Sequence, residues 1–327
     1  MGAAAVGNDD GMPVEYCNPV HPGSFADPFV LRSGGRYLAF GTGRIVDGRV
    51  FEVLASPDLV RWTSLGGALE PVDPALGSDY WAPEVAEHDG RFHMYYSVGH
   101  GDAGHQLRVA VADLPEGPYR DEGVNLAPAE RFAIDPHPFR DEDGTWYLFY
   151  AHDVIEGTDR IGTMLAVDVL DGMTRLRGEG RTILPPSADW QIYQRDREMY
   201  GQVFDWHTLE GPFVRRHEGR YYCFYSGGSW LEPTYGVGFA VADHPLGPWA
   251  EPADRDPLLR TVPGRVIGPG HNSLVVGPAG EDVIVYHAWD PDRTARRMFI
   301  DPVRWTSDGP EVDGPSWQPR RLPGAPS

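Results

Sequence analysis

The chain has 327 residues, 41% of them hydrophobic, so it can bury a large core in one domain or two. Its formal net charge of −20 disfavours binding to phosphate backbones and anionic membranes, so we predict no nucleic-acid partner and no membrane partner. The 40 Gly, the 31 Pro and an aromatic content of 12% favour short strands and tight turns over long helices, which predicts an all-β protein.

The N-terminal residues do not have the pattern of a signal peptide. Residues 1–11 lack a basic region and an apolar core, and no run of 18 apolar residues occurs later. We therefore expect a cytoplasmic protein, or a secreted one if a signal peptide precedes the sequence as given. The two cysteines, Cys17 and Cys223, do not form a disulfide framework, although one bridge between them stays open.

Five similar units follow one another along the chain. In the first unit, a strand A-D-P-F-V at 26–30 is followed by a turn at Ser33-Gly34-Gly35 and a second strand R-Y-L-A-F at 36–40. The other openings are Y-W-A-P-E-V at 80–85, A-I-D-P-H-P-F at 133–139, E-G-P-F-V at 210–214 and G-H-N-S-L-V-V at 270–276. The third strands of the second and fourth units end alike, in A-V-A-D-L-P-E-G-P-Y and A-V-A-D-H-P-L-G-P-W.

The repeat predicts a β-propeller with five four-stranded blades. The units recur at intervals of about 50 to 75 residues, which suits a blade built of short strands. We predict a single catalytic domain over 1–327, with a C-terminal tail at 313–327. Within it the blades are placed at 18–66, 78–123, 132–177, 208–252 and 266–312.

Aligning the five openings places one residue of each unit in the same register. These residues are Asp27, Ala82, Asp135, Glu210 and His271. Because the inner strands of a propeller surround one axis, we expect these side chains to meet there. An acidic residue before Pro or Gly is often only a turn former, but three carboxylates in one register favour a functional site.

Converging carboxylates are the catalytic groups of glycoside hydrolysis. One carboxyl group acts as general acid and another as general base, and in inverting enzymes they lie about 6.5 to 9.5 Å apart. Trp81 would offer an apolar face to a sugar, and the small Ala82 would leave room for the ring. Four more aromatic residues occupy the long connection 178–207, where they either form a sugar-stacking wall beside the axis or pack beneath a loop: Trp190, Tyr193, Tyr200 and Trp206.

Together, these motifs resemble glycoside hydrolase family 43. The likeness rests on A-D-P-F-V, Y-W-A-P-E-V, I-D-P-H-P-F-R-D-E-D-G-T-W-Y-L-F-Y and E-G-P-F-V, and it runs from about Asn18 to Trp305. The family comprises five-bladed propellers that invert anomeric configuration and act as α-L-arabinofuranosidases, β-xylosidases and arabinanases.

The resemblance implies a role for each axial residue. Asp27 would be the general base, Glu210 the general acid, and Asp135 the residue that orients Glu210 and raises its pKa. His271 would lie beside an axial calcium held mostly by water, or beside water alone. Arg296, in preference to Arg297, would contact the sugar, and no cofactor is required.

We therefore expect an inverting hydrolase that removes terminal α-L-arabinofuranose, or β-D-xylose, from plant cell-wall polysaccharides or oligosaccharides. An endo-arabinanase would use the same residues in an open groove. Related five-bladed families hydrolyse fructans or phosphorolyse mannosides, but phosphorolysis needs a basic phosphate pocket and this axis is acidic. A non-catalytic carbohydrate-binding propeller would have no use for three carboxylates together.

Overall fold

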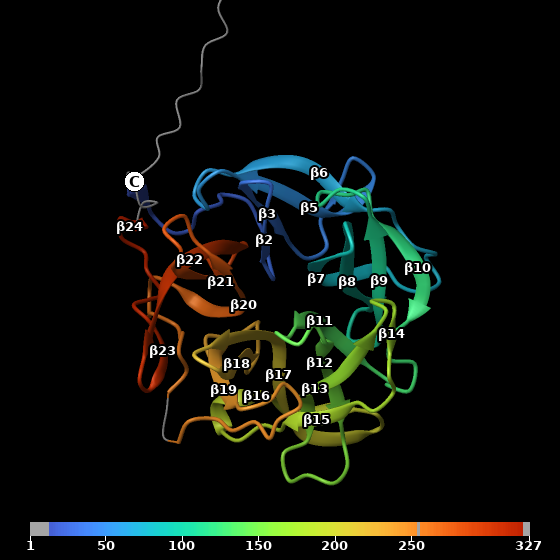
Figure 1. Ribbon diagram of the computed structural model, residues 1–327. Coiled ribbons are helices and arrows are strands. Elements are labelled where there is room, and N and C mark those ends of the chain that lie inside the picture. Colours follow the sequence, from blue (N-terminus) through green and yellow to red (C-terminus); the bar gives the residue numbers. More distant parts are fainter. Residues whose placement is uncertain (1–12, 254–255, 323–327) are drawn as a thin grey trace, which may run out of the picture.

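Five blades of β-strands surround a central axis, and the first strand of each blade lies nearest to it (Figure 1); the third and fourth blades are joined into one continuous sheet. The computed structural model describes residues 13–253 and 256–322. Nearly all the regular structure in these residues is strand. The predicted all-β, five-bladed propeller is therefore confirmed.

Blades 1, 2 and 5 each contain four antiparallel strands in succession. Blade 1 comprises β2 (Phe29–Ser33), β3 (Arg36–Phe40), β5 (Arg49–Ser56) and β6 (Thr63–Leu69), with the short β4 (Ile45–Val46) paired to β5. Blade 2 comprises β7 (Asp79–His88), β8 (Arg91–His100), β9 (Ala103–Ala112) and β10 (Arg120–Asn125). Blade 5 comprises β20 (Ile267–Val276), β21 (Asp282–Trp289), β22 (Arg296–Thr306) and β23 (Gly309–Val312).

Blades 3 and 4 depart from the predicted pattern. Blade 3 comprises β11 (Ala133–Arg140), β12 (Trp146–Val154) and β13 (Gly162–Asp171), and its outer edge is shared by β14 (Arg175–Leu176) and β15 (Arg181–Leu184), beyond the predicted end at 177. Blade 4 has three strands, β17 (Gln202–His217), β18 (Arg220–Gly227) and β19 (Gly236–Ala242). Isolated bridges at Ala250 and Leu259 replace its predicted fourth strand. The segment that carries them is rich in proline, which cannot donate to a ladder.

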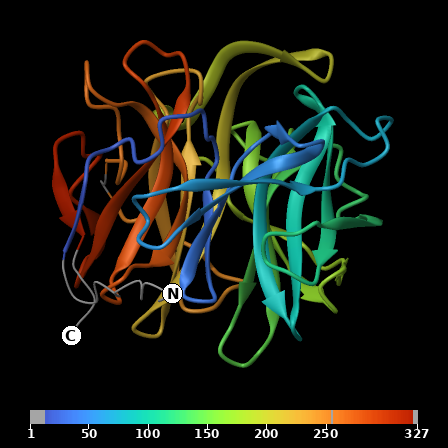
Figure 2. The same ribbon diagram turned by 90° about the horizontal axis from the view of Figure 1, so that it is seen from above.

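A long hairpin precedes blade 4. It follows the 3-10 helix η1 (Asp189–Gln191) and is formed by β16 (Ile192–Met199) and the first half of β17. The two strands are joined at Tyr200 and Gly201, which both have positive φ, as a type I′ turn requires. Figure 2 shows this olive hairpin arching over one end of the propeller.

The two ends of the described chain meet beside blade 5. Strand β1 (Val14–Tyr16) pairs antiparallel with β24 (Arg320–Leu322), and Asn18 exchanges two hydrogen bonds with the backbone of Ile300. Ser316 and Leu322 are buried. The predicted tail therefore packs on the domain as far as residue 322, and 323–327 lie outside the described residues.

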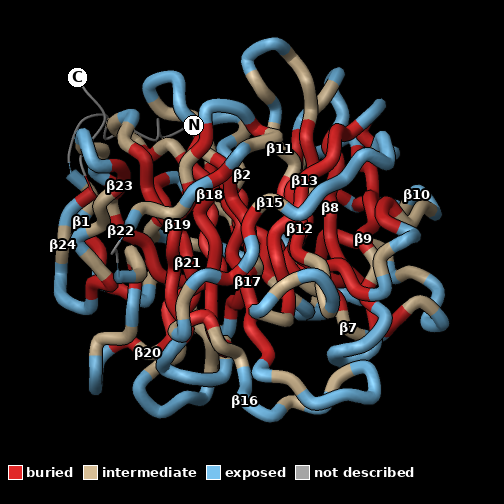
Figure 3. The backbone as a smooth tube through the Cα atoms, turned by 90° about the horizontal axis from the view of Figure 1, so that it is seen from below, coloured by how far each residue is buried: buried red, intermediate tan, exposed pale blue. Residues whose placement is uncertain are grey.

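The buried residues lie along the strands in the interior of the propeller (Figure 3), and hydrophobic side chains of neighbouring blades pack together there. For example, Tyr95 and Val109 of blade 2 pack with Leu148 and Ala166 of blade 3. Cys223 is buried in blade 4 and Cys17 is exposed, and both are free thiols, so the bridge left open by the sequence does not form. In the described part of the chain, no helix is long and apolar enough to span a membrane.

Candidate active site

A pocket of about 290 Å³ lies on the propeller axis, at the end where the inner strands begin. Seven of its lining residues come from the inner strands or from just before them. They include all three predicted carboxylates. The lining residues are Asp27, Thr42, Asp79, Trp81, Asp102, Ile134, Asp135, Glu210, Trp230, His271 and Arg296.

A backbone irregularity within the inner strand of blades 2 to 5, and just before that of blade 1, turns side chains into this pocket. The register of β7, β11, β17 and β20 shifts at this point, as at a β-bulge, which re-aims side chains. One residue of each blade has a positive φ there: Asp27 (51°), Ala82 (46°), Asp135 (58°), Gly211 (56°) and His271 (48°). The fourth member is Gly211, so the predicted alignment of Glu210 with the other four is wrong by one residue.

Glu210 instead occupies the position before the bulge, together with Trp81 and Ile134, which also line the pocket. Two consecutive residues of an inner strand can therefore face the axis. Gly211 serves at the bulge because its φ favours glycine and because its neighbour is the ring of His271, which a Cβ atom would approach to 3.2 Å.

Four polar groups surround the carboxylate of Asp27, and one of them is Nδ1 of His287, 3.1 Å from Oδ1. Thr42 donates a hydrogen bond to Oδ2, Arg296 donates to Oδ1 at 3.2 Å, and Nδ1 of His271 lies 3.5 Å from Oδ1. Burial raises the pKa of Asp27, but the nearby positive charges of Arg296 and His271 more than offset it and hold the pKa well below its ordinary value. Asp27 is therefore ionised at neutral pH.

Glu210 has the opposite electrostatic environment. Removal of its carboxyl group from water, followed by the negative charge of Asp135, raises its pKa to about 8. The hydroxyl of Tyr235 donates a hydrogen bond of 2.5 Å to its Oε1. Glu210 is therefore largely protonated at neutral pH, in the same pocket as the ionised Asp27.

The pKa of Asp135 lies between those of Asp27 and Glu210. Burial, opposed by the charge of His271 and reinforced by that of Asp27, raises its pKa to about 6. Its Oδ2 accepts a hydrogen bond of 2.9 Å from the backbone N–H of Gly211, the residue after Glu210. Asp135 thus contacts the strand segment that carries Glu210 and adds a negative charge next to it.

The protein groups around His271 do not make a calcium site by themselves. Calcium takes six to eight oxygen ligands, whereas the described residues contain no group of three or more His, Cys, Asp or Glu side chains placed to hold a metal. Nδ1 of His271 faces Asp27 and Asp135, at 3.5 and 3.9 Å. Although burial lowers the pKa of His271, these carboxylates raise it above its ordinary value, which favours the charged form of the imidazole at this position.

Two aromatic rings form the sides of the pocket. The ring of Trp81 stacks on His105 at 3.7 Å between centroids, and Trp230 lies 4.5 Å beneath the guanidinium of Arg296. Arg297 instead pairs with Asp290 outside the pocket, which supports the choice of Arg296. The structure does not place Ala82 against a sugar: it is 2% exposed, does not line the pocket, and its backbone N–H donates to Thr42.

Sequence comparison among the five units did not identify several residues of the site. Thr42 and Trp230 each come just after the second strand of a blade, in G-T-G and S-G-G-S-W. Because second strands end at the side of the propeller where inner strands begin, polar and aromatic residues at these positions could have been predicted near the pocket. Tyr235 and His287 carry no such signal. The backbone N–H of Asp27 donates to Nδ1 of His287, whose pKa is lowered by burial to about 4, and the ring of His287 stacks on Tyr235.

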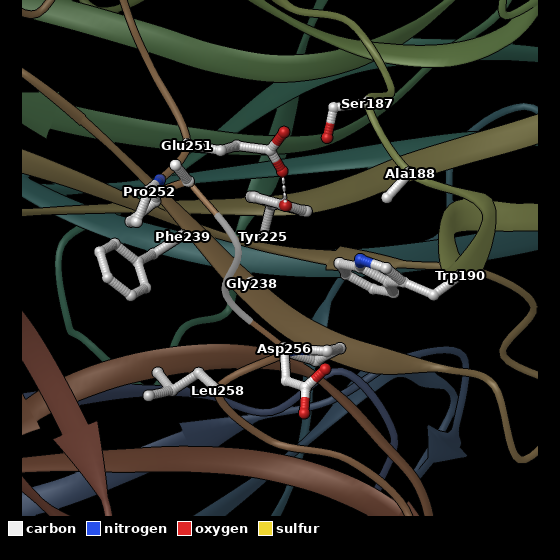
Figure 4. Close-up of a pocket in the computed structure, with 12 residues that line it drawn as sticks. Ser187, Ala188, Trp190, Tyr225, Gly238, Phe239, Glu251, Pro252, Asp256 and Leu258 are labelled. Carbon is white, nitrogen blue, oxygen red and sulfur yellow. Dashed lines mark hydrogen bonds between the residues drawn. The ribbon is translucent and has the colours of Figure 1, made fainter.

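The aromatic residues of 178–207 do not form a wall in the axial pocket, because none of the four lines it. Trp206 is 1% exposed. Trp190 lines a second pocket of about 490 Å³ on the outer part of blade 4, where it stacks on Tyr225 (Figure 4). The carboxylate of Glu251 in that pocket accepts hydrogen bonds from Tyr225 and Gln191, so this carboxylate already has partners within the protein.

Comparison with known proteins agrees with this geometry. A family model described as "Glycosyl hydrolases family 43" matches residues 16–310. The chain is 30% identical to the β-D-galactofuranosidase xynD of Aspergillus niger, over 90% of this chain and 86% of that protein. It is 26% identical to the extracellular exo-α-(1→5)-L-arabinofuranosidase ArbA of Cellvibrio japonicus, over 88% and 86%. The crystal structure of a thermostable family-43 glycoside hydrolase superposes with a TM-score of 0.82 at 33% identity, covering 95% of this chain and 99% of that one.

Proposed function

The chain belongs to glycosyl hydrolases family 43, and we propose that it hydrolyses the bond to a terminal sugar with Asp27 as general base and Glu210 as general acid. One observation carries this assignment. The axial pocket holds an ionised carboxylate and a carboxyl group whose pKa is about 8. Acid and base catalysis at one bond requires one protonated and one ionised carboxyl group at the same pH, and therefore two groups with different pKa values.

The proposed reaction is a single displacement with inversion. Asp27 takes a proton from water as the water oxygen attacks the anomeric carbon, and Glu210 gives its proton to the glycosidic oxygen as that bond breaks. The products are a sugar of inverted anomeric configuration and the shortened alcohol. Arg296 and Thr42 keep Asp27 ionised and oriented, since both donate to its carboxylate.

Asp135 is proposed to act through Glu210. Its negative charge opposes ionisation of Glu210, and its contact with the N–H of Gly211 positions the strand next to the acid. A lectin-like propeller would not need this arrangement, because binding a neutral sugar requires no proton donor.

We propose a terminal pentose as the sugar, α-L-arabinofuranose before β-D-xylose. Two observations support this choice. The pocket volume of about 290 Å³ lies at the small end of ligand sites, and the Cellvibrio japonicus relative is named for release of arabinofuranose. Nitrophenyl glycosides of the two sugars would test the proposal, with NMR of the first-formed anomer reporting inversion. Failure to hydrolyse either glycoside would contradict the pentose assignment.

A second candidate is terminal β-D-galactofuranose, the substrate in the name of the Aspergillus niger relative. This sugar has the ring configuration of α-L-arabinofuranose and one additional hydroxymethyl carbon. Asp79 and Asp102 add carboxylates to the pocket beyond the three at the axis, and these could accept hydrogen bonds from an extra hydroxyl group. The ratio of kcat/KM for nitrophenyl β-D-galactofuranoside and α-L-arabinofuranoside decides between the two sugars.

The proposed chemistry uses no cofactor, since acid and base are both supplied by side chains. A calcium ion held mainly by water beside His271 stays a prediction of the family resemblance, and treatment with a chelator tests it through the melting temperature. Location in the cytoplasm also stays a prediction. The Cellvibrio japonicus relative is named as extracellular.

A further inference from the structure

The hairpin of β16 and β17 makes one contact that reaches across the pocket rim. Nη2 of Arg197 on β16 lies 2.8 Å from Oδ2 of Asp102, which belongs to the turn between β8 and β9 of blade 2. Asp102 lines the axial pocket and Arg197 does not. A segment that leads into blade 4 is therefore joined to blade 2, across the position of blade 3.

Arg197 is held in place for this contact. Its guanidinium lies 4.6 Å from the ring centre of Tyr193 and 5.6 Å from that of Trp206, and its side chain is only 14% exposed. Cation–π contacts of this kind favour one orientation of the guanidinium. Arg197 therefore presents its charge to Asp102 from a fixed position.

The turn that carries Asp102 is held from the other side. Oδ2 of Asp79 accepts a hydrogen bond of 3.0 Å from the backbone N–H of Gly101 and another of 2.9 Å from Ser78. Asp79 also lines the pocket. The turn thus lies between Asp79 and Arg197, and both contacts place it at the rim.

The hairpin is also attached to blade 3. The hydroxyl of Tyr200, at its tip, donates a hydrogen bond of 2.6 Å to Oδ2 of Asp153 at the end of β12. Lower on the same hairpin, burial and then the charge of Asp102 raise the pKa of Tyr193, and Glu210 contributes as well. The hairpin is therefore attached to blade 3 at its tip, through Tyr200, and to blade 2 along its first strand, through Arg197.

We propose that the ion pair between Arg197 and Asp102 is a latch that closes this side of the pocket and restricts the enzyme to chain ends. Cleavage of an internal bond requires the polysaccharide to extend out of the site on two sides. A rim closed from blade 2 to blade 4 leaves only one side open, so only a chain end can enter. This inference rests on the proposed glycosidase function and adds the determinant of exo action.

The test compares Arg197→Ala with Arg195→Ala. Arg195 lies on the same strand, but its partner Asp205 belongs to the same hairpin, so it is a matched control. Amide hydrogen exchange reports the latch without reference to activity. We expect exchange in the segments 100–104 and 192–204 to be severalfold faster in Arg197→Ala, the order expected for an ion pair whose carboxylate is 63% exposed and whose guanidinium has aromatic contacts, and unchanged in Arg195→Ala.

Products from linear α-(1→5)-arabinan report the consequence of opening the latch. Wild type and Arg195→Ala should release the monosaccharide, whereas Arg197→Ala should release oligosaccharides too, with kcat/KM on the aryl arabinofuranoside near the wild-type value. Unchanged exchange in Arg197→Ala, or faster exchange with the monosaccharide still the sole product, would overturn the latch. A wild-type enzyme that cleaves neither substrate would instead overturn the proposed activity on arabinofuranosides. The exchange experiment would still test the contact between Arg197 and Asp102, because it does not depend on activity.

Discussion

The hydroxyl of Tyr235 donates a 2.5 Å hydrogen bond to the carboxyl group of Glu210, although the two residues belong to different segments of blade 4. Tyr235 is 1% exposed. Its ring occupies space that exists because residue 270 is glycine, since a Cβ atom there would lie 1.9 Å from the ring. The hydrogen bond favours the ionised form of Glu210 and so lowers its pKa against the effect of burial.

Tyr235→Phe should therefore move the alkaline limb of the pH profile to higher pH. Without the hydroxyl group the pKa of Glu210 rises further above about 8, and the acid stays protonated over a wider range. The limb is measured as kcat/KM against pH. Tyr95→Phe is the control, because it removes a buried hydroxyl that bonds Met173 far from the axis. A limb that moves to lower pH in Tyr235→Phe would contradict the prediction.

Asp135→Asn should move the same limb in the opposite direction. The substitution removes the negative charge next to Glu210, so the pKa of Glu210 falls and its proton is lost at lower pH. The shift should be partial, because burial is the larger cause of the raised pKa and remains. The amide oxygen of Asn can still accept the N–H of Gly211, which keeps the strand in place. No movement of the limb would mean that Asp135 acts through position alone.

The two catalytic residues should differ in their dependence on the leaving group. Glu210→Ala should lower kcat/KM much more on natural glycosides than on nitrophenyl glycosides, whose leaving group needs little protonation. Asp27→Ala should lose about 10²- to 10⁴-fold on both, because water must be activated in either case. Added azide should restore part of the activity of Asp27→Ala by replacing water. Equal losses in Glu210→Ala on both substrates, together with high activity in Asp27→Ala, would reverse the assignment.

Arg296→Ala should move the acidic limb of the profile to higher pH. The charge of Arg296 lowers the pKa of Asp27, so its removal raises that pKa and the base becomes protonated earlier as the pH falls. KM should also rise, because Trp230 loses the guanidinium above its ring. Arg297→Ala is the matched control, since that guanidinium pairs with Asp290. An unchanged acidic limb in Arg296→Ala would exclude this electrostatic role.

Glu84 should contribute to stability and not to the chemical step. Its Oε2 lies 2.6 Å from Nδ1 of His137, while Nε2 of His137 accepts the backbone N–H of Val214, so the pair links the inner strands of blades 2, 3 and 4. Glu84→Ala leaves a buried imidazole without its partner and should lower the free energy of unfolding by about 3 kcal/mol. Urea denaturation measures this change, and Glu87→Ala, at an exposed position of the same strand, should be near wild type. Equal stabilities would contradict the structural role.

The sequence by itself determined the repeat, the all-β class and the three carboxylates and one histidine that line the pocket: Asp27, Asp135, Glu210 and His271. These properties can be predicted from local sequence, because each blade opens with the same pattern of a strand interrupted before Pro or Asn. Five such units can bury their apolar faces only against one another, which predicts the propeller. Asp27, Asp135 and His271 were therefore predicted at the pocket, where the structure places them. The one-residue error at Glu210 arose because the repeat does not show which of two adjacent residues has the positive φ.

The family resemblance implied different roles for these carboxyl groups, but only the tertiary structure provides the physical cause of the difference. Asp27 and Glu210 have similar sequence surroundings, yet burial with positive neighbours keeps the first ionised and burial with a negative neighbour keeps the second protonated. The groups responsible, such as Arg296, Tyr235 and His287, come from strands and loops that no repeat pattern connects. The contact of Arg197 with Asp102 is likewise invisible in the sequence. Electrostatic effects depend on distance and on exposure to water, and both exist only after the five blades have closed around the axis.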